Sequence, residues 1–291
     1  MTSQRILRAP AKINLTLHVL GRRLDGFHEL DGFVAFAGVG DILEFNPNGA
    51  LTLDLAGPTA EAAGANHDNL VLRAAMALAE RVDGLALGRF RLWKRLPVAA
   101  GLGGGSSDAA AALRLLATEA GLPDDDPRIM DAAASVGSDV PVCLAPRARR
   151  MSGRGETLGP RIALPGLAAV LVNPRVPLST AKVFAGLALR LGQATGLSAS
   201  PAPPMQADAE TAIAALASGR NDLQNTAIAA VPEIADVLAA LSKTREIHLA
   251  RMSGSGPTCF GLYATRIAAR KAAAELAKAH PDWWVRATSI A

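Results

Sequence analysis

The stretch at residues 97–113, PVAAGLGGGSSDAAAAL, combines very small residues with groups that could bind an anion. Four glycines and two serines precede Asp108 within positions 101–108, and an alanine-rich segment follows. A strand ending near Pro97, a glycine loop and then a helix would expose backbone N–H groups to a phosphate at the positive helix end. Glycine permits a close approach because it has no side chain. Phosphate binding is one interpretation of this loop, and tight backbone packing is the other.

Two common nucleotide-binding motifs are excluded here. The P-loop needs Lys followed by Ser or Thr after its glycines, whereas Ser106 follows Gly105 directly. The dinucleotide fingerprint needs a glycine where Ser106 stands. A phosphate at this loop would therefore be held in a different way.

Asp108 adds a carboxylate near the start of the expected helix. A carboxylate beside bound phosphates would repel them unless a cation such as Mg²⁺ lay between them. The same side chain could instead complement the positive end of the helix. The residues alone leave both interpretations open.

Strand-like and helix-like segments alternate along the chain and must position these groups. Residues 11–21 alternate apolar and polar side chains, which predicts a half-buried strand with Lys12 and Asn14 on its polar face. Residues 40–55 predict two strands joined by a hairpin turn at Asn48. Helical spacing and capping residues predict helices at 68–82 (with Asp68 or Asn69 as N-cap), 108–121, 129–137, 179–191, 211–219, 232–244 and 266–280. Further strands are expected at 90–96, at 167–172 and after the glycine loop at 252–258.

The composition is that of a folded globular protein. The chain has 291 residues, 50% of them hydrophobic, and a formal net charge of +4, too small to predict a nucleic-acid-binding surface. Cys143 and Cys259 follow no metal-ligand or disulfide spacing and are expected to be buried. Without a membrane span or a signal sequence, a cytoplasmic location is the expectation. A composition shift near 159–165 predicts two α+β domains, residues 1–160 and 161–291.

The glycine stretch closely resembles the second motif of the GHMP kinases, whose loop wraps the phosphates of ATP. Further matching motifs follow in the expected order: KRLP before the loop, GSDVP at 137–141, NDL at 221–223 and MSGSGPT at 252–258. The resemblance implies a two-domain fold, with a ribosomal-protein-like β-α-β N-terminal domain, a ferredoxin-like C-terminal domain and the active site in the cleft between them. It also implies an ATP-dependent kinase that uses Mg²⁺.

The resemblance assigns the chemistry to two residues. Asp139 matches the catalytic base, although on its own this segment would favour a turn or helix-capping role. Lys12 matches the basic partner that stabilises developing negative charge. The ATP contacts implied by the resemblance are Asn66, Asn69, Lys94, Pro97, Val98, Ala99, Ala100, Gly101, Leu102, Gly103, Gly104, Gly105, Ser106, Ser107 and Asp108.

The segment AKINLTLHVLGRRLDGFHEL is similar to the signature of one branch of the family, which phosphorylates a methylerythritol linked to cytidine diphosphate. Phe27 stands where that branch usually has a tyrosine that stacks on cytosine, and stacking needs only the ring face. His28 matches the histidine that hydrogen-bonds the base. The resemblance adds Asn14, Thr180 and Phe184 as substrate contacts, along with Asp139.

Two other functions compete with this interpretation. Another small-molecule GHMP kinase would leave the DGFHEL turn unexplained, and a nucleic-acid-binding module would use the basic surface. The basic cluster at 147–154 is expected to be a solvated hairpin, although it could attract anionic substrates. The expected partners are small molecules, without nucleic acid or membrane, for a monomer or a homodimer.

Overall fold

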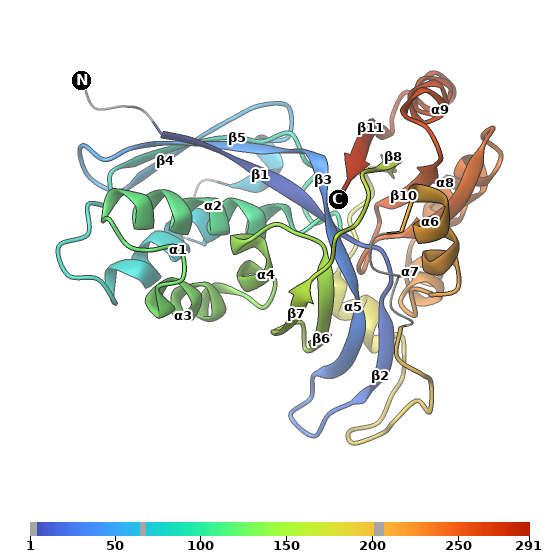
Figure 1. Ribbon diagram of the computed structural model, residues 1–291, viewed down its shortest axis with the longest axis horizontal. Helices are drawn as coiled ribbons and strands as arrows, with labels where there is room; N and C mark the ends of the chain where they lie inside the picture. The colour runs from blue at the N-terminus through green and yellow to red at the C-terminus, as the bar shows by residue number, and fades with distance from the viewer. Residues whose placement is uncertain (1–4, 65–67, 201–206) are drawn as a thin grey trace. The chain divides into compact units, whose positions relative to one another are not determined.

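A computed structural model of the chain describes residues 5–64, 68–200 and 207–291 (Figure 1). These residues form two compact units, each assembled from separate parts of the chain. The first contains residues 5–12, 40–64, 68–98 and 103–146, and the second contains 13–39, 99–102, 147–200 and 207–291. The sequence predicts two domains that meet at one boundary, after residue 160, and this boundary stays a prediction.

The first unit packs helices on a small sheet. β5 (Arg89–Trp93) lies between β4 (Thr52–Ala56), which is parallel to it, and the second half of β3 (His28–Asn46), which is antiparallel. β1 (Arg5–Asn14) also pairs with β3. Figure 1 shows the helices on one face of these strands. They are α1 (Leu70–Ala79), α2 (Gly104–Glu119), α3 (Pro127–Val136) and α4 (Val140–Leu144), and a short 3₁₀ helix, η1 (Glu61–Ala63), follows β4 in the chain.

The predicted hairpin at Asn48 is wrong. β3 and β4 are consecutive strands, yet β5 lies between them and pairs with both. Their neighbour comes from beyond α1, so that β4, α1 and β5 form a β-α-β unit. The Asn-Gly pair marks a turn between the strands but cannot specify which strand fills the space beside them.

The predicted strand at 11–21 is two strands. β1 ends at Asn14 and β2 (His18–Arg22) begins four residues later. The polar side chains are also buried, because they have partners: Thr16 Oγ1 lies 2.9 Å from Ser200 Oγ, and His18 Nδ1 lies 3.1 Å from the carbonyl oxygen of Ser198. The prediction of a half-buried strand is therefore wrong, because alternation of residue types does not reveal that the polar side chains are buried as well.

The second unit contains two sets of paired strands. One set has the order β9–β10–β8–β11 and is antiparallel throughout, with α8 and α9 packed against it. In the other set, the first half of β3 pairs with β2 on one side and β6 on the other, and β6 pairs with β7. The bounds are β6 (Arg149–Gly153), β7 (Thr157–Arg161), β8 (Leu167–Asn173), α5 (Thr180–Ala185), α6 (Ala209–Ala217), α7 (Gln224–Ala230), α8 (Glu233–Ser242), β9 (Ile247–Met252), β10 (Cys259–Tyr263), α9 (Arg266–Ala279) and β11 (Trp284–Ile290).

Most predicted elements are present, and the α+β class is confirmed. The helix predicted at 179–191 ends early, since α5 stops at Ala185 and Ala188 has a φ of +53°. α4, α7, β9 and β11 were not predicted. Both cysteines are buried and unpaired with each other, as expected. Within the described ranges, no helix is long and apolar enough to cross a bilayer.

Candidate active site

Lys12 and Asp139 form an ion pair in the first unit. Lys12 lies near the end of β1, and Asp139 directly precedes α4. Lys12 Nζ is 2.7 Å from Asp139 Oδ1, and the lysine side chain is 4% exposed whereas the aspartate side chain is 35% exposed. The Asp139 side chain makes no capping hydrogen bond to α4. The pair therefore presents a solvent-accessible carboxylate held by a buried ammonium group.

The N-terminus of α2 packs against Lys12. The N-cap residue is Gly103, with a φ of +58°, and no side chain caps the helix. A Cβ on Gly103 would lie 3.1 Å from Lys12 Cβ, so that a larger residue would push the lysine away. Because the first N–H groups of a helix have no intrahelical acceptor, they are available to an anion beside the ion pair.

The two serines of the loop differ in what they can bind. Ser107 Oγ donates a hydrogen bond of 2.6 Å to the carbonyl oxygen of Pro10, and the residue is buried. Ser106 is half-buried and makes no side-chain hydrogen bond within the described residues. Ser106 is thus the serine whose hydroxyl could contact a phosphate at this helix end.

The first half of the glycine loop packs in the second unit. A Cβ on Gly101 would lie 2.6 Å from the carbonyl oxygen of Ser253 and 2.8 Å from that of Gly256. Ser253 Oγ also donates to the carbonyl oxygen of Gly101 at 3.1 Å. Gly101 therefore serves tight backbone packing, whereas Gly105 is exposed.

The other predicted ATP contacts have different environments. Asn66 lies outside the described residues. Asn69 is the N-cap of α1, where its Oδ1 accepts a backbone hydrogen bond of 3.0 Å, which settles the choice between the two N-cap candidates. Val98 and Ala99 are exposed, whereas Leu102 is buried.

Lys94 belongs to a buried cluster of three charged side chains. Lys94 Nζ donates to Asp41 Oδ2 at 2.6 Å and to Asp108 Oδ2 at 2.7 Å. All three residues are at most 3% exposed. The cluster joins β3, the segment after β5 and α2. Lys94 was expected at the adenine end of ATP, and this role stays a prediction, but its ammonium is already bound by two carboxylates.

The environment of Asp108 does not favour the cation-binding role considered for it from the sequence, and its role at the helix end stays a prediction. Its Oδ1 is buried without a hydrogen-bond partner among the described residues, and its Oδ2 is bound by Lys94. Burial, together with the nearby Asp41, raises the pKa of Asp108 to about 7, although Lys94 acts to lower it. A buried, lysine-bound carboxyl is a poor ligand for a cation arriving with phosphate. It instead anchors α2 to the sheet.

Asn14 lies beside the second glycine loop. Its backbone N–H donates to Ser253 Oγ at 3.1 Å, and a Cβ on Gly254 would lie 3.3 Å from its side-chain oxygen. Asn221, from the NDL motif, donates hydrogen bonds of 2.8 Å to the carbonyl oxygens of Met252 and Gly254. The motif thus positions this loop, a role that its residue types did not reveal.

The residues predicted for the cytidyl end lie in the second unit. Phe27 follows the turn between β2 and β3 and is 53% exposed. His28 packs on Phe184, with ring centroids 4.9 Å apart and ring planes 33° from parallel. Thr180 Oγ1 lies 2.8 Å from Ser255 Oγ, which connects α5 to the second glycine loop. The structure thus brings His28 together with Phe184 and Thr180 together with the MSGSGPT segment.

The basic cluster at 147–154 forms the predicted hairpin, made of β6 and β7. Two of its arginines are not simply solvated. Arg150 Nε lies 2.5 Å from Oδ1 of the buried Asp31. The guanidinium carbon of Arg154 lies 4.6 Å from the centroid of the Phe27 ring.

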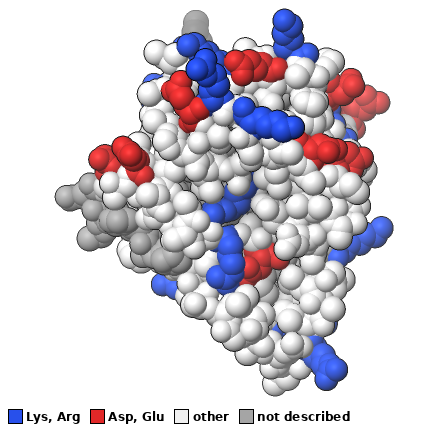
Figure 2. Space-filling view, turned by 90° about the vertical axis from the view of Figure 1, so that its right-hand side faces the viewer, with Lys and Arg blue, Asp and Glu red and all other residues white. Residues whose placement is uncertain are grey.

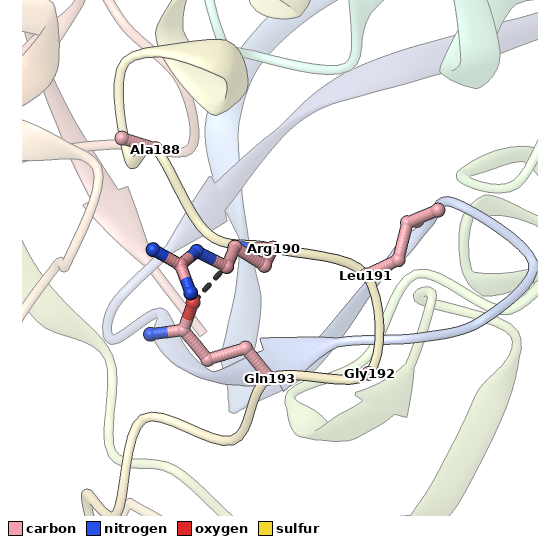
Figure 3. A pocket seen from close by; sticks show the side chains of 5 residues that line it. All are labelled: Ala188, Arg190, Leu191, Gly192 and Gln193. Atoms are coloured by element: carbon pink, nitrogen blue, oxygen red, sulfur yellow. Dashed lines mark hydrogen bonds between the residues drawn. The ribbon is translucent and has the colours of Figure 1, made fainter.

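A pocket of about 490 Å³ lies in the segment between α5 and α6 (Figure 3). Arg190 and Gln193 face each other across it, and the backbone N–H of Arg190 donates to Gln193 Oε1 at 2.9 Å. Leu191 points away from these two side chains (Figure 3). Sequence reasoning missed this pocket because it assigned the first part of the segment to a helix.

The face shown in Figure 2 carries interspersed acidic and basic side chains. The described residues form no continuous basic surface on this face.

Two family models match the chain. The N terminal domain of GHMP kinases matches residues 69–146, and the GHMP kinases C terminal model matches residues 206–282. A 4-diphosphocytidyl-2-C-methyl-D-erythritol kinase of Methylobacterium radiotolerans is 56% identical over 284 residues, covering 97% of this chain and 98% of the relative. A protein of the same name from Xanthobacter autotrophicus is also 56% identical, over 286 residues, with 97% and 98% coverage.

Solved structures agree with the sequence matches. A crystal structure of 4-(cytidine 5'-diphospho)-2C-methyl-D-erythritol kinase superposes with a TM-score of 0.75 at 33% identity, covering 98% of this chain and 99% of that chain. L. major mevalonate kinase in complex with R-mevalonate superposes with a TM-score of 0.69 at 16% identity, covering 100% of this chain and 96% of that chain. The latter likeness concerns the fold alone.

Proposed function

The chain belongs to the GHMP kinases, in the family of the 4-diphosphocytidyl-2-C-methyl-D-erythritol kinases, and we propose on this basis that it phosphorylates 4-diphosphocytidyl-2-C-methyl-D-erythritol. The reaction uses ATP, acts on the 2-hydroxyl and gives the 2-phosphate and ADP. It serves isoprenoid precursor biosynthesis by the methylerythritol phosphate pathway. The proposal is supported by relatives that match over nearly their whole length.

One observation carries the catalytic part of the proposal: the Lys12–Asp139 ion pair beside the uncapped N-terminus of α2. Phosphoryl transfer needs a base near the acceptor hydroxyl and positive charge near the transferring group. The first unit supplies both within one small region. The end of β1, the start of α2 and the residue before α4 meet there. A helix end with only a structural role would not require this arrangement.

In the proposed step, Asp139 takes the proton of the acceptor hydroxyl while the hydroxyl oxygen bonds to the γ-phosphorus of ATP. The bond between that phosphorus and the β,γ-bridging oxygen breaks, and ADP leaves with the electron pair. Lys12 stabilises negative charge as it develops in this step. The buried position of Lys12 strengthens this effect because water screens it less.

The γ- and β-phosphates of ATP would lie at the first turn of α2. The N–H groups of Gly104, Gly105 and Ser106 point from this turn, and the Ser106 hydroxyl adds a further donor. Gly104 and Gly105 leave the backbone accessible because they have no side chains.

Mg²⁺ accompanies ATP in this proposal, but the described side chains provide few ligands for it. Among the described residues, no group of three His, Cys, Asp or Glu side chains could hold a metal ion. Asp108 is buried and bound by Lys94, so it does not fit a metal ligand. No step is therefore assigned to a protein-bound metal. A cytoplasmic location, and a monomer or homodimer that binds no nucleic acid, stay predictions.

Phe27, His28 and Phe184 would bind the cytosine. Partial burial, helped by the positive charge of Arg22, lowers the pKa of His28, which favours the neutral ring. A neutral imidazole has one donor and one acceptor, which suits the mixed edge of cytosine. Asn14 and Thr180 are proposed to contact the methylerythritol end of the substrate.

The test is ADP release from Mg-ATP with 4-diphosphocytidyl-2-C-methyl-D-erythritol, mevalonate, homoserine and galactose offered separately. Turnover with the cytidyl substrate alone, with the phosphate on its 2-hydroxyl by ³¹P NMR, is the expected result. Turnover with a different acceptor would retain a GHMP kinase but reject the assigned substrate. No turnover with any of the four would reject the proposed activity.

A further inference from the structure

The turn between β6 and β7 places an arginine on an exposed aromatic ring. The guanidinium carbon of Arg154 lies 4.6 Å from the centroid of Phe27, well within the range of a cation–π contact. Phe27 is 53% exposed, on the turn between β2 and β3. A half-exposed phenylalanine with a cation on its ring is a specific arrangement rather than core packing.

The strand register brings these two turns together. β2 pairs with β3 from Arg22 opposite His28, and β6 pairs with β3 from Gly153 opposite Leu30. Both turns therefore emerge at the same end of the sheet, as Figure 1 shows. Arg154 is the residue after Gly153, and Phe27 precedes His28, so that each is the first residue beyond a pairing strand.

The Arg154 turn is held by its own residues. Glu156 Oε2 accepts a hydrogen bond of 2.5 Å from the backbone N–H of Arg154, and Glu156 Oε1 lies 3.8 Å from Arg154 Nε. Gly153 has a φ of +73°, and a Cβ on it would lie 2.8 Å from both Glu156 carboxylate oxygens. A glycine is therefore needed for Glu156 to fold back, and this fold presents the guanidinium to Phe27.

Hydrogen bonds hold the backbone of the turn that carries Phe27. The backbone N–H of Arg23 donates to the carbonyl oxygen of Phe27 at 2.7 Å, and the Phe27 N–H donates to Asp25 Oδ1 at 3.1 Å. These bonds fix the backbone but leave the side-chain rotamer unrestrained. Arg154 restrains it from one side and leaves the other side of the ring for a ligand.

We propose that Arg154 is a positioning residue for the cytidyl end of the substrate, acting by holding the ring of Phe27 in its stacking orientation. This inference rests on the proposed function. The guanidinium covers one face of the ring, and the cytosine stacks on the other. The basic hairpin thus determines specificity through an aromatic ring, not through contact with the substrate phosphates.

The experiment is a double-mutant cycle on the KM for 4-diphosphocytidyl-2-C-methyl-D-erythritol, with R154A, R154Q, F27A and F27A/R154A. Arg147→Ala is the matched control, because Arg147 is an exposed arginine of the same basic segment. R154A and R154Q are expected to raise this KM about two- to fivefold, as for an exposed cation–π contact. The kcat and the KM for ATP should not change, and R147A should behave as the wild type. In the F27A background, loss of Arg154 should have no further effect.

Two results would overturn the proposal. An unchanged KM in R154A would remove Arg154 from recognition, and an equal effect of R154A with and without Phe27 would mean that the arginine contacts the substrate directly. Calorimetric titration of the same proteins with cytidine 5'-diphosphate gives a readout without turnover. If the wild type does not turn over the cytidyl substrate, the proposed function is rejected. If the wild type nevertheless binds cytidine 5'-diphosphate more tightly than R154A does, the role of Arg154 in holding the Phe27 ring is still supported.

Discussion

Lys12 Nζ lies 2.7 Å from Asp139 Oδ1, with the lysine buried and the aspartate partly open to solvent. The asymmetry matters because only the carboxylate can be reached by an acceptor hydroxyl, while the ammonium acts from behind it in a weakly screened environment. Gly103 lies so close to the lysine side chain at the start of α2 that an added Cβ would come within 3.1 Å of Lys12 Cβ. The pair and the helix end are therefore one structural arrangement.

Lys12→Met should lower kcat by roughly 10²- to 10³-fold, because it removes positive charge beside the transferring group. Methionine is of similar length and apolar, so it suits the buried position and should preserve the fold. Steady-state kinetics and a urea unfolding curve measure the two effects separately. A kcat within a few-fold of the wild type would show that the lysine only supports the structure.

Gly103→Ala should reduce kcat by at least about tenfold, because the added Cβ would meet Lys12 Cβ at 3.1 Å at a left-handed residue. Gly84→Ala is the matched control, since Gly84 has a φ of +71° but no atom within 4 Å of the added Cβ. Both variants should lose about 1 kcal/mol of stability, since alanine is strained at a positive φ. Equal kcat values in the two variants would contradict a role for this close contact.

Asp108→Asn should remove the part of the pH dependence of the free energy of unfolding that comes from the Asp108 carboxyl. The folded state keeps the Asp108 proton up to a pKa of about 7, whereas the unfolded chain releases it near 3.8. The free energy of unfolding of the wild type, measured relative to the variant, therefore falls as pH rises from about 4 to 7 and is constant above. The expected total change is on the order of 1–4 kcal/mol. Urea unfolding at pH 4.5 and 7.5 measures it.

The control for this experiment is Asp54→Asn, an exposed carboxylate on β4. Its difference from the wild type should be nearly the same at both pH values. If Asp108→Asn shows no more pH dependence than Asp54→Asn, then Asp108 is ionised in the folded protein at both pH values.

Arg251→Gln should destabilise the protein by about 2–4 kcal/mol. The Arg251 guanidinium is buried and donates to the carbonyl oxygens of Leu15, Leu216 and Gly219, at 2.8, 2.9 and 2.6 Å. These acceptors would lose their partners in the variant. Chemical denaturation measures the loss, with Arg270→Gln on the exposed face of α9 as control. A similar loss in both variants would contradict the bonding role.

Sequence patterns predicted the helices and strands themselves better than they predicted which strands pair with each other. Alanine-rich spacing identified α2, and the continuous apolar run at residues 167–172 identified β8 as a buried strand, because these signals are local. The pairing of β4 with β5 depends on a strand more than 30 residues further along, so the turn at Asn48 could not reveal it. α5 stops at Ala185 and Ala188 has a φ of +53°, a break in the helix that the spacing of apolar residues did not reveal.

The candidate site shows the same limit. Motif matching selected Lys12 and Asp139, and the structure brings these two side chains together. The same matching grouped Lys94 with the ATP contacts, but residue type could not show that Asp41 and Asp108 bind its ammonium. Arg154 was treated as part of a charged hairpin, because its position over Phe27 depends on the register of β6 against β3.

The most direct test of the catalytic proposal is single-turnover phosphoryl transfer, measured by rapid quench with saturating ATP and 4-diphosphocytidyl-2-C-methyl-D-erythritol, in the wild type and Asp139→Asn. Asp126→Asn is the control, since Asp126 also forms an ion pair, with Arg128, but at the N-cap of α3. Asp139→Asn should slow the chemical step by on the order of 10²- to 10⁴-fold while ATP binding is retained. A transfer rate close to that of the wild type and of Asp126→Asn would contradict the role of Asp139 as the base.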